Sequence, residues 1–391
     1  MRVLHLFDKY LNTTMNWAHL LMSETPETEV VVAAPLYVRN RFYNPRFEFV
    51  HSPLNQILGI SDLKDEWTIS WFQTFIFKLN KHFVFKYFLK KLIKHKKIDV
   101  VHAHFANVAC HYLPVLKSLN LPLVVSFYGY DYEHLLFIKP HYKVLYARLF
   151  EQAAAIICEG EHGVQLLHDM GCAREKLHVV KLGLKINKSL IVNVKEKKAN
   201  QLTLVQAASF LPKKGIIYTI KAFAKVLKTC PNMHLTLVGE RADSDYYDSI
   251  VALIAEEKLS DFVDIKDFVK SDFNAFLSQY DVFIHPSCYS DARDCEGGAP
   301  IVLLNAQSQG LPIISTTHCD IPSEVLHGQT GLLSPEKDVD SLAKNIGLFY
   351  TMDNVEYQWY SKNTIQHVEN EYDIEKSAKV LAKIYKNISG V

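Results

Sequence analysis

A single acidic residue, Glu296, stands directly before two glycines, an alanine and a proline, and this short loop leads into the apolar run IVLLNAQSQ. Glycine allows the backbone to approach a ligand closely, and proline is favoured in a first helical turn, so the order predicts a helix that starts near Pro300. The amides of that turn, together with the helix dipole, form a site for an anion. A carboxylate beside them accepts hydrogen bonds from hydroxyl groups. The pattern therefore predicts a ligand with both phosphate and hydroxyl groups, such as a nucleotide or a sugar phosphate.

A second polar loop, LPKKG, contains Lys213 and Lys214 and follows the apolar run LTLVQAASF. A Lys-Lys-Gly turn is often only the start of a helix, and the glycine pair at 297–298 lacks the spacing of a dinucleotide-binding or Walker loop. The combination of both loops on separate strand–helix units carries more weight than either alone. It favours a phosphate or diphosphate pocket in which Lys214 reaches over the anion.

Short apolar runs alternate with amphipathic stretches along most of the chain, and this order is typical of parallel sheets covered by helices on both faces. Ligands of such sheets bind beyond the carboxyl ends of the strands, where both polar loops fall. The runs that predict strands are 2–7, 30–35, 99–105, 121–129, 154–160, 202–210, 234–240, 263–268, 281–287, 312–316 and 331–334. We therefore predict two doubly wound α/β domains in tandem.

The pattern stops over residues 186–201, which are charged and contain no clear element. We place the first domain at 1–190, a linker at 191–201 and the start of the second domain at 202. Residues 1–190 hold 23 Lys and Arg against 16 Asp and Glu, whereas the remainder holds 20 against 26. This difference in charge indicates that the two domains face different partners.

The composition is that of a globular protein, with 49% hydrophobic and 22% charged residues among 391. The start MRVLHLF lacks the features of a secretory signal, and no stretch is long and apolar enough to span a bilayer. Seven scattered cysteines without a CxxC pair indicate reduced thiols, so we expect a cytoplasmic protein. His102 and His104 alternate along a strand end, which is more typical of a structural feature than of a metal site, and we expect no metal.

One segment, residues 67–98, contains no acidic residue, and eight lysines interleaved with Phe and Tyr lie between positions 78 and 97. A basic aromatic helix can lie on an anionic membrane surface, and one expectation is peripheral binding to the inner face of the cytoplasmic membrane. The alternative is an ordinary surface helix whose apolar face packs on the first sheet. No recognised module supports nucleic acid as a partner.

The ordered segments SFLPKKGIIYTIKAF, LTLVGE, DVFIHPS, EGGAPIVLLNAQSQGLPIISTTHCDIPSEVL and GQTGLLSP resemble glycosyltransferase family four. The likeness is strong over 200–350 and weaker over 1–190, where HAHFANVA and VVSFYGYD contribute. It implies the GT-B fold, an α/β fold of two Rossmann-like domains that face a cleft. The second domain would then end near 365, and residues 366–391 would form a helix that returns to the first domain.

The resemblance also implies a retaining transfer of a sugar from a UDP- or GDP-sugar to a glycan or lipid-linked acceptor, in polysaccharide biosynthesis. Glu296 would contact the transferred sugar, and Lys214 would bind the donor diphosphate. No protein nucleophile and no metal are needed, because the leaving diphosphate helps to deprotonate the acceptor. The remaining donor-side positions are Ser209, Lys213, Gly239, Phe268, Val269, Gly297, Gly298, Ala299, Pro300, Ile301 and Asn305. The positions expected on the acceptor side are Thr13, Thr14, His104, Tyr128 and Gly129.

Three positions depart from the family pattern. Asn305 stands where a second glutamate would hold the ribose hydroxyls, so we expect weaker nucleotide binding. Ser209 occupies the likely place of a basic residue, and Tyr128 occupies that of a histidine. These departures leave two alternatives open: a nucleotide-sugar 2-epimerase on the same fold, or a protein that binds a nucleotide or glycan without catalysis.

Overall fold

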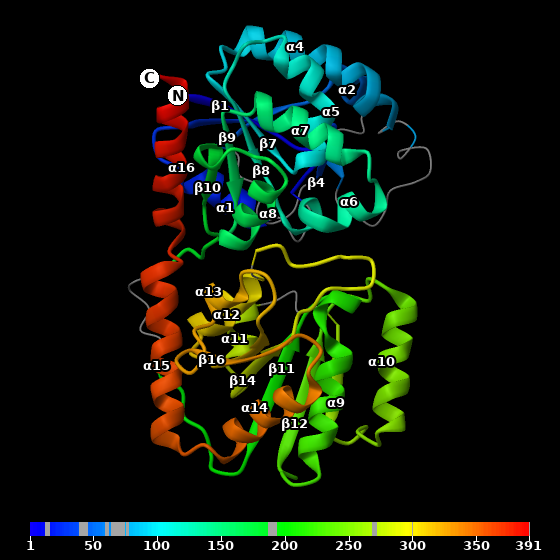
Figure 1. The fold of residues 1–391 in the computed structure, drawn as a ribbon, viewed down its shortest axis with the longest axis vertical. Coiled ribbons are helices and arrows are strands. Elements are labelled where there is room, and N and C mark those ends of the chain that lie inside the picture. The colour runs from blue at the N-terminus through cyan, green and yellow to red at the C-terminus, as the bar shows by residue number, and fades with distance from the viewer. Residues whose placement is uncertain are drawn as a thin grey trace. The chain divides into compact units, whose positions relative to one another are not determined.

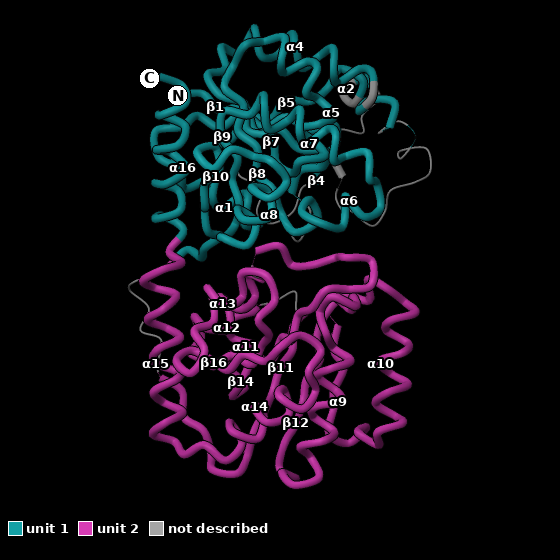
Figure 2. The backbone as a smooth tube through the Cα atoms, in the orientation of Figure 1, with its two compact units in different colours: residues 1–185, 374–391 teal, residues 186–373 magenta. Residues whose placement is uncertain are grey.

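The computed structural model describes residues 1–11, 16–38, 46–58, 62–63, 75, 78–186, 194–267, 272–298 and 300–390. The chain divides into two compact units (Figure 2). The first contains residues 1–185 and 374–391, and the second contains residues 186–373. Each unit is built around its own parallel sheet, so each is described by itself.

The main sheet of the first unit has seven parallel strands in the order β10-β9-β8-β7-β1-β3-β5. Its strand order reverses between β1 and β7, which pair in parallel with His5 opposite His102. The strands are β1 (Arg2–Leu6), β3 (Glu29–Ala33), β5 (Glu48–Val50), β7 (Val100–His104), β8 (Leu123–Ser126), β9 (Ala155–Cys158) and β10 (Leu177–Val179). Three further short strands, β2 (Lys9–Tyr10), β4 (Leu36–Val38) and β6 (Asp62–Leu63), form a small separate sheet.

Helices cover both faces of the seven-stranded sheet because successive side chains of a strand point to opposite faces. On β7, Val101 and Ala103 join a core with helices on one face, while Val100 joins the core under the C-terminal helix. The first face carries α4 (Phe85–Lys96), α5 (Ala106–Lys117), α6 (Leu135–Ile138), α7 (Tyr142–Gln152) and α8 (Glu161–Asp169). The other carries α1 (Asn16–Glu24) and α16 (Ile374–Ser389), which pack together. Figure 1 shows α16 alongside this unit.

The basic segment forms a π-helical turn at Asn80–Val84 that continues into α4. One side of α4 buries Phe85, Leu89, Leu92 and Ile93 in the core of the first unit. This agrees with the ordinary surface-helix interpretation for that side. Residues 67–74 and 76–77 of the segment lie outside the described residues.

The second unit has a six-stranded parallel sheet in the order β13-β12-β11-β14-β15-β16. The order reverses between β11 and β14, which is the point where doubly wound sheets bind their ligands. The strands are β11 (Leu202–Ala207), β12 (Met233–Val238), β13 (Val263–Lys266), β14 (Val282–His285), β15 (Ile313–Thr316) and β16 (Gly331–Ser334).

One face of this second sheet packs on α9 (Ile216–Leu227), α10 (Ser244–Glu256) and α14 (Val339–Thr351), as well as part of α15 (Asn354–Glu371). The opposite face packs on α11 (Phe273–Leu277), α12 (Ile301–Ser308) and α13 (Ile321–Glu324). Continuous apolar strands such as β14, which is fully buried, are required because helices cover both sides. The expectation of doubly wound α/β architecture is confirmed for both units.

The divisions between units fall after Lys185 and Asp373, and not at the positions read from the sequence. Residues 194–201, expected to be linker, attach to the second unit: the amide of Lys195 donates to Ser361 Oγ at 2.9 Å, and Lys197 Nζ donates to Tyr350 O at 3.1 Å. α15 also stays in the second unit, so the chain returns to the first at α16, beyond the expected position 366.

Among the described residues, no helix has the length and apolar character needed to cross a membrane.

Candidate active site

The site of the second unit lies where β11 and β14 end, at the reversal of strand order. After β11, a 3₁₀ turn at Pro212–Lys214 presents the two lysines, and Gly215 follows with φ of +65°. A Cβ atom at Gly215 would lie 2.0 Å from the carbonyl oxygen of Pro286, so only glycine allows the two loops to approach this closely. The amide of Cys288 donates to the carbonyl of Lys213 at 2.9 Å and ties the loops together.

Lys214 and Glu296 form a buried ion pair at this place. Lys214 Nζ lies 2.7 Å from Oε1 and 2.8 Å from Oε2 of Glu296, and the two side chains are 16% and 7% exposed. The backbone carbonyl of Lys214 is held in turn by Gln206 Nε2 at 2.7 Å, and Gln206 Oε1 accepts from Thr219 Oγ1. The lysine is therefore anchored on β11 and α9.

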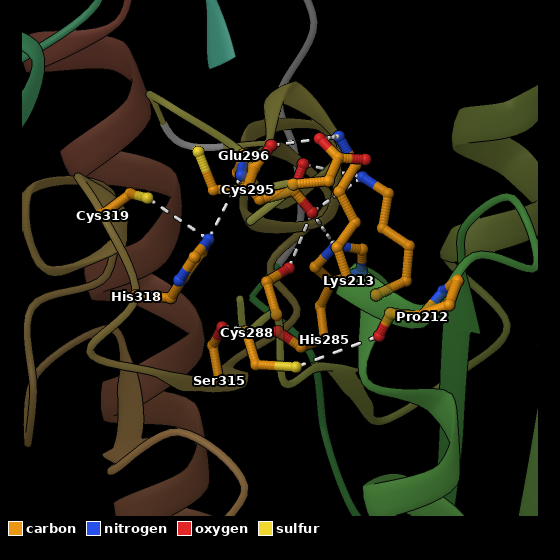
Figure 3. Close-up of polar contacts among 12 residues, drawn as sticks. Pro212, Lys213, His285, Cys288, Cys295, Glu296, Ser315, His318 and Cys319 are labelled. Atoms are coloured by element: carbon orange, nitrogen blue, oxygen red, sulfur yellow. Dashed lines mark hydrogen bonds and ion pairs between the residues drawn. The ribbon is translucent and has the colours of Figure 1, made fainter. Parts of the chain in front are cut away.

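Lys213 lies beside the pair and bonds to the loop that precedes Glu296. Its Nζ contacts Asp294 Oδ1 at 3.1 Å. The same Nζ contacts the carbonyl oxygen of Cys295 at 3.0 Å, and Figure 3 labels Lys213 and Cys295. Burial alone would lower the pKa of Lys213, but attraction to Glu296 and Asp294 outweighs it and raises that pKa. Lys213 thus remains a cation in the unliganded site.

The carboxylate of Glu296 has further partners on β14 and the loop after it. Ser287 Oγ donates to Glu296 Oε1 at 2.8 Å, and His285 Nε2 lies 3.6 Å from the same oxygen. Burial by itself raises the pKa of Glu296, but Lys214, His285 and Lys213 together hold it well below its usual value. Burial lowers the pKa of His285, whose two ring nitrogens have no hydrogen-bond partner at normal distance. The site therefore holds an ionised carboxylate next to a neutral imidazole.

The backbone of Glu296 is bound from the other side by His318, which follows β15. The peptide N–H of Glu296 donates to His318 Nε2 at 3.1 Å, as Figure 3 shows. A backbone amide can only donate, so Nε2 accepts and the ring proton lies on Nδ1. That Nδ1 donates to Glu336 Oε1 at 2.7 Å, and Glu336 Oε2 accepts from the amide of Tyr289 at 2.9 Å.

Beyond Glu296 the chain turns at Gly297, with φ of +82°, and enters α12 at Ile301. Pro300 is the residue before the helix and not part of its first turn, so the helix begins one residue later than expected. Asn305 turns its Nδ2 back to the carbonyl of Ile301 at 3.0 Å, so its amide group is engaged by its own helix.

The structure brings Lys214 and Glu296 into direct contact, and Lys213 contacts the carbonyl oxygen of Cys295, the residue before Glu296. Gly297 and Gly298 are next in the chain. Gly239 directly follows β12, and a Cβ atom there would lie 1.8 Å from the carbonyl oxygen of Ala208. Ser209, which is partly exposed, follows that carbonyl. The roles assigned to these residues stay predictions. Five predicted positions lie outside the described residues: Thr13, Thr14, Phe268, Val269 and Ala299.

In the first unit, His104 and Tyr128 were expected beside the acceptor, with Gly129, and these roles stay predictions. His104 is only 1% exposed, and its Nδ1 bonds to the hydroxyl of Tyr128 at 2.9 Å, so it is a buried partner of Tyr128. Tyr128 itself is 6% exposed, and Gly129 begins a π-helical turn at Tyr130–His134.

Three histidines of the first unit, His5, His102 and His104, could in principle hold a metal, because their ligand nitrogens lie within 4.8 Å of one another. Most of these nitrogens are already engaged in the structure. His5 Nδ1 contacts His104 Nε2 at 3.0 Å, and His102 contacts Tyr385 at 2.5 Å and Ser126 at 2.8 Å. These three histidines therefore form a hydrogen-bonded contact between the strands of the sheet and α16.

Sequence reasoning missed four residues of the second-unit site: His285, Ser287, His318 and Glu336. A signal was present, because all four lie at or just beyond the ends of β14, β15 and β16, and the same rule of strand ends led to Lys214. The rule was applied to loops with glycines and lysines, whereas HPS, TTHCD and SPEK carry neither a glycine pair nor a lysine pair.

Two family models match the chain. The one described as "Glycosyl transferases group 1" matches residues 187–366, and the one described as "Glycosyltransferase Family 4" matches residues 61–188. Together they match residues 61–366, which include parts of both units.

Named glycosyltransferases are among the proteins that are similar to this chain in sequence or structure. A putative colanic acid biosynthesis glycosyltransferase of Escherichia coli is 28% identical over 291 residues, which are 74% of this chain and 70% of that protein. An amylovoran biosynthesis glycosyltransferase of Erwinia amylovora is 29% identical over 249 residues, 63% of this chain and 59% of that protein. The crystal structure of Anabaena HepE in complex with UDP and glucose matches with a TM-score of 0.71 at 15% identity, over 99% of this chain and all of that chain. The expected GT-B fold is confirmed by this likeness.

Proposed function

The chain belongs to glycosyltransferase family 4 and is a glycosyltransferase of polysaccharide biosynthesis; from this premise we propose that it transfers a sugar from a nucleotide diphosphate donor with retention of configuration. In this reaction the bond between the sugar C1 and the donor diphosphate breaks, and a bond from C1 to the acceptor oxygen forms on the same face. The proton of the acceptor hydroxyl passes to an oxygen of the departing diphosphate. The sugar goes to a hydroxyl of a glycan or lipid-linked acceptor.

The observation that carries the proposal is the cluster of two lysines and one carboxylate at the strand reversal of the second unit. Without a ligand, Lys214 is neutralised by Glu296, and Lys213 by Asp294. A bound diphosphate competes for both ammonium groups, which releases the oxygens of Glu296 to accept hydrogen bonds from the sugar hydroxyls. Cations placed before the reaction stabilise the charge that develops on the leaving diphosphate.

The two lysines supply the positive charge that a divalent cation would otherwise provide, so we propose transfer without a metal ion. The base of the donor nucleotide is inferred from one similar structure, that of HepE in complex with UDP and glucose. We infer a UDP-sugar donor here, with a GDP-sugar as the alternative. The amides at the start of α12 and at Gly297 would face the phosphates and the sugar.

A binding screen tests the donor site. Thermal shifts are measured with UDP, GDP, ADP and CMP, with and without magnesium. We expect a shift with UDP or GDP that magnesium does not change. A shift that requires magnesium would contradict the metal-free proposal, and no shift with any nucleotide would favour a non-catalytic protein.

A transfer assay tests the assigned roles. Lys214→Ala should weaken donor binding and slow transfer, whereas Lys221→Ala, an exposed lysine on α9, should do neither. Glu296→Ala should reduce transfer by about a thousandfold, within the range for loss of a group that acts on the transition state. Glu256→Ala, on the exposed surface of α10, is the matched control. Equal transfer by the Glu296 and Glu256 variants would refute the role of Glu296.

Asn305 offers a separate test of the ribose contact. Asn305→Glu should tighten UDP binding, because a carboxylate accepts from both ribose hydroxyls. Its amide currently bonds to Ile301 O, and that bond is lost without harm because the position is only partly buried. Unchanged or weaker binding in a calorimetric titration would show that the ribose lies elsewhere.

We also propose that the first unit binds an anionic membrane surface, which would bring a lipid-linked acceptor to the enzyme. The exposed apolar side chains Leu79, Phe83 and Tyr87 follow one another at intervals of four residues: Leu79 directly precedes the π-helical turn, Phe83 lies on it and Tyr87 lies on α4. Phe75 is also exposed and continues the interval. Phe83 is 70% exposed and Tyr87 is 82% exposed. Exposed lysines flank this stripe at positions 78, 90, 91, 94 and 97.

The chemistry of the stripe favours lipid over a protein partner because aromatic rings are enriched at the membrane interface and lysines are attracted to anionic headgroups. Phe83→Ser with Tyr87→Ser should abolish sedimentation with phosphatidylglycerol vesicles. Val355→Ser removes an equally exposed apolar side chain, 78% exposed, from the second unit and should change nothing. Equal retention of all variants, or equal binding to phosphatidylcholine, would contradict this proposal.

A further inference from the structure

The peptide unit that joins Cys295 to Glu296 is held at both of its polar atoms. Its carbonyl oxygen accepts from Lys213 Nζ at 3.0 Å, and its N–H donates to His318 Nε2 at 3.1 Å. Rotation of this peptide plane would break both bonds. Because the plane sets the direction of the Glu296 Cα–Cβ bond, the two contacts orient the carboxylate.

Two glycines follow Glu296. Gly297 has φ of +82°, and neither Gly297 nor Gly298 carries a side chain that could contact the carboxylate. The side-chain contacts that bear on the direction of the Glu296 Cα–Cβ bond are therefore those made to the peptide before it.

His318 is held in place by Glu336, which lies just beyond the end of β16. The histidine is fully buried, its Nδ1 donates to Glu336, and this bond fixes the tautomer whose Nε2 accepts from Glu296. The thiol of Cys319 lies 3.2 Å from the same Nε2. Hydrogen bonding with Cys295 raises the pKa of Cys319, and burial raises it further. Cys319 therefore stays a thiol, and the lone pair of His318 Nε2 accepts from the groups that donate to it.

We propose that His318 is a positioning residue for Glu296, and that Glu336 sets the tautomer that makes this possible. His318 acts on the backbone and does not touch the substrate. This inference rests on the proposed function only where sugar transfer is the activity that is measured. Misplacement of a catalytic group by about 1 Å can reduce a rate by about a hundredfold.

Two variants separate the two hydrogen bonds of the ring. In His318→Gln the amide oxygen reaches the place of Nε2, so the bond from Glu296 is kept and the bond to Glu336 is lost. In His318→Asn the shorter amide occupies the place of Nδ1, so the bond to Glu336 is kept and the bond from Glu296 is lost. Both variants keep a polar side chain of similar volume, and Cys319→Ser serves as the control for the neighbouring thiol.

We expect His318→Gln to keep kcat within about threefold of the wild type, and His318→Asn to lower kcat by about a hundredfold with a smaller change in KM. Cys319→Ser should behave as the wild type. The reverse order of the two His318 variants, or equal rates for both, would overturn the proposal, because His318 would then act through Glu336 as part of the scaffold.

Hydrogen exchange of the Glu296 amide gives a readout that needs no substrate. This amide should be protected in the wild type and in His318→Gln, and should exchange faster in His318→Asn, while amides of β14 remain unchanged. If transfer is absent from every protein but the exchange pattern holds, the proposed function fails and the positioning role stands. If transfer is present but the amide exchanges alike in all variants, the positioning role is refuted.

Discussion

Replacing Lys214 with methionine removes the ammonium group from the buried pair and keeps the length and apolar stem of the side chain. At distances of 2.7 and 2.8 Å, the attraction between the two charges amounts to about 6 kcal/mol with an effective dielectric constant near 20. Desolvation of both groups offsets part of this. Loss of one partner of a buried pair typically destabilises a protein by about 3–5 kcal/mol.

The lower end of that range applies here because Glu296 keeps other partners. Ser287 still donates to Oε1 at 2.8 Å, and the ammonium of Lys213 remains close by. We therefore expect Lys214→Met to reduce the stability of the second unit by about 3 kcal/mol at neutral pH. Lys221→Met, on the exposed side of α9, should change it by less than about 0.5 kcal/mol.

The loss should depend on pH. Burial works to raise the pKa of Glu296, but Lys214 and the other partners hold it well below its usual value. The stabilisation from the carboxylate is thus complete above the unfolded-state pKa of about 4.3, and is lost as the pH falls through the folded-state value. Removal of Lys214 moves the folded-state pKa of Glu296 upward. Acidification therefore lowers the stability of the variant by less than it lowers that of the wild type. The difference between wild type and variant should shrink below about pH 4.

Native-state hydrogen exchange, resolved by peptides from β11 and β14, measures the second unit separately from the first. A loss of 3 kcal/mol corresponds to roughly a hundredfold faster exchange of the most protected amides. The reasoning is refuted if Lys214→Met exchanges like Lys221→Met at neutral pH, or if the difference grows on acidification. The first result would mean that the pair makes no net contribution to stability, and the second that the ionised carboxylate of Glu296 is not the source of the contribution.

Three further changes have clear expected outcomes. Gly239→Ala should lower the melting temperature and reduce donor binding, because its Cβ would lie 1.8 Å from the carbonyl oxygen of Ala208 and the loss should be about 3 kcal/mol; normal stability would mean that the strand ends are less closely packed than described. Gly347→Ala in α14 meets no atom within 4 Å and should stabilise the protein by up to about 1 kcal/mol in the same thermal assay, so a lower melting temperature would contradict it. Tyr385→Phe deprives His102 Nδ1 of its partner at 2.5 Å and should speed hydrogen exchange in α16 by a factor that corresponds to about 1–3 kcal/mol; unaltered exchange would show that the hydroxyl is dispensable.

The strands of both sheets could be predicted because each is an apolar run covered on two sides, a pattern that needs no knowledge of distant partners. Lys214 and Glu296 were found for a related reason, since both lie in polar loops that follow apolar strands, and the structure places those strands next to each other. The place of His318, just beyond the end of β15, was open to the same rule, but its role was not. Its ring acts on a backbone amide 22 residues earlier in the chain, and neither residue type nor spacing predicts such a contact.

The division into units was harder to predict from the sequence. Lys195 and Lys197 belong to a charged stretch that resembles a linker, yet their contacts with Ser361 and Tyr350 attach this stretch to the second unit. These partners lie more than 150 residues away in sequence. Hydrophobic periodicity predicts which face of a helix or strand packs in its own unit. The unit to which a polar segment belongs depends on single hydrogen bonds, which periodicity does not predict.

The position of α16 has a consequence for how the protein is made. This helix covers one face of the first sheet with Ile374, Leu381 and Tyr385, yet the ribosome releases it only after the whole of the second unit. At about 5–20 residues per second, the nascent first unit waits on the order of ten seconds or more with that apolar face uncovered. During this interval the face is open to chaperones and to neighbouring nascent chains. A first unit expressed by itself would need residues 374–391 joined to it, or supplied as a separate peptide, to reach its native state.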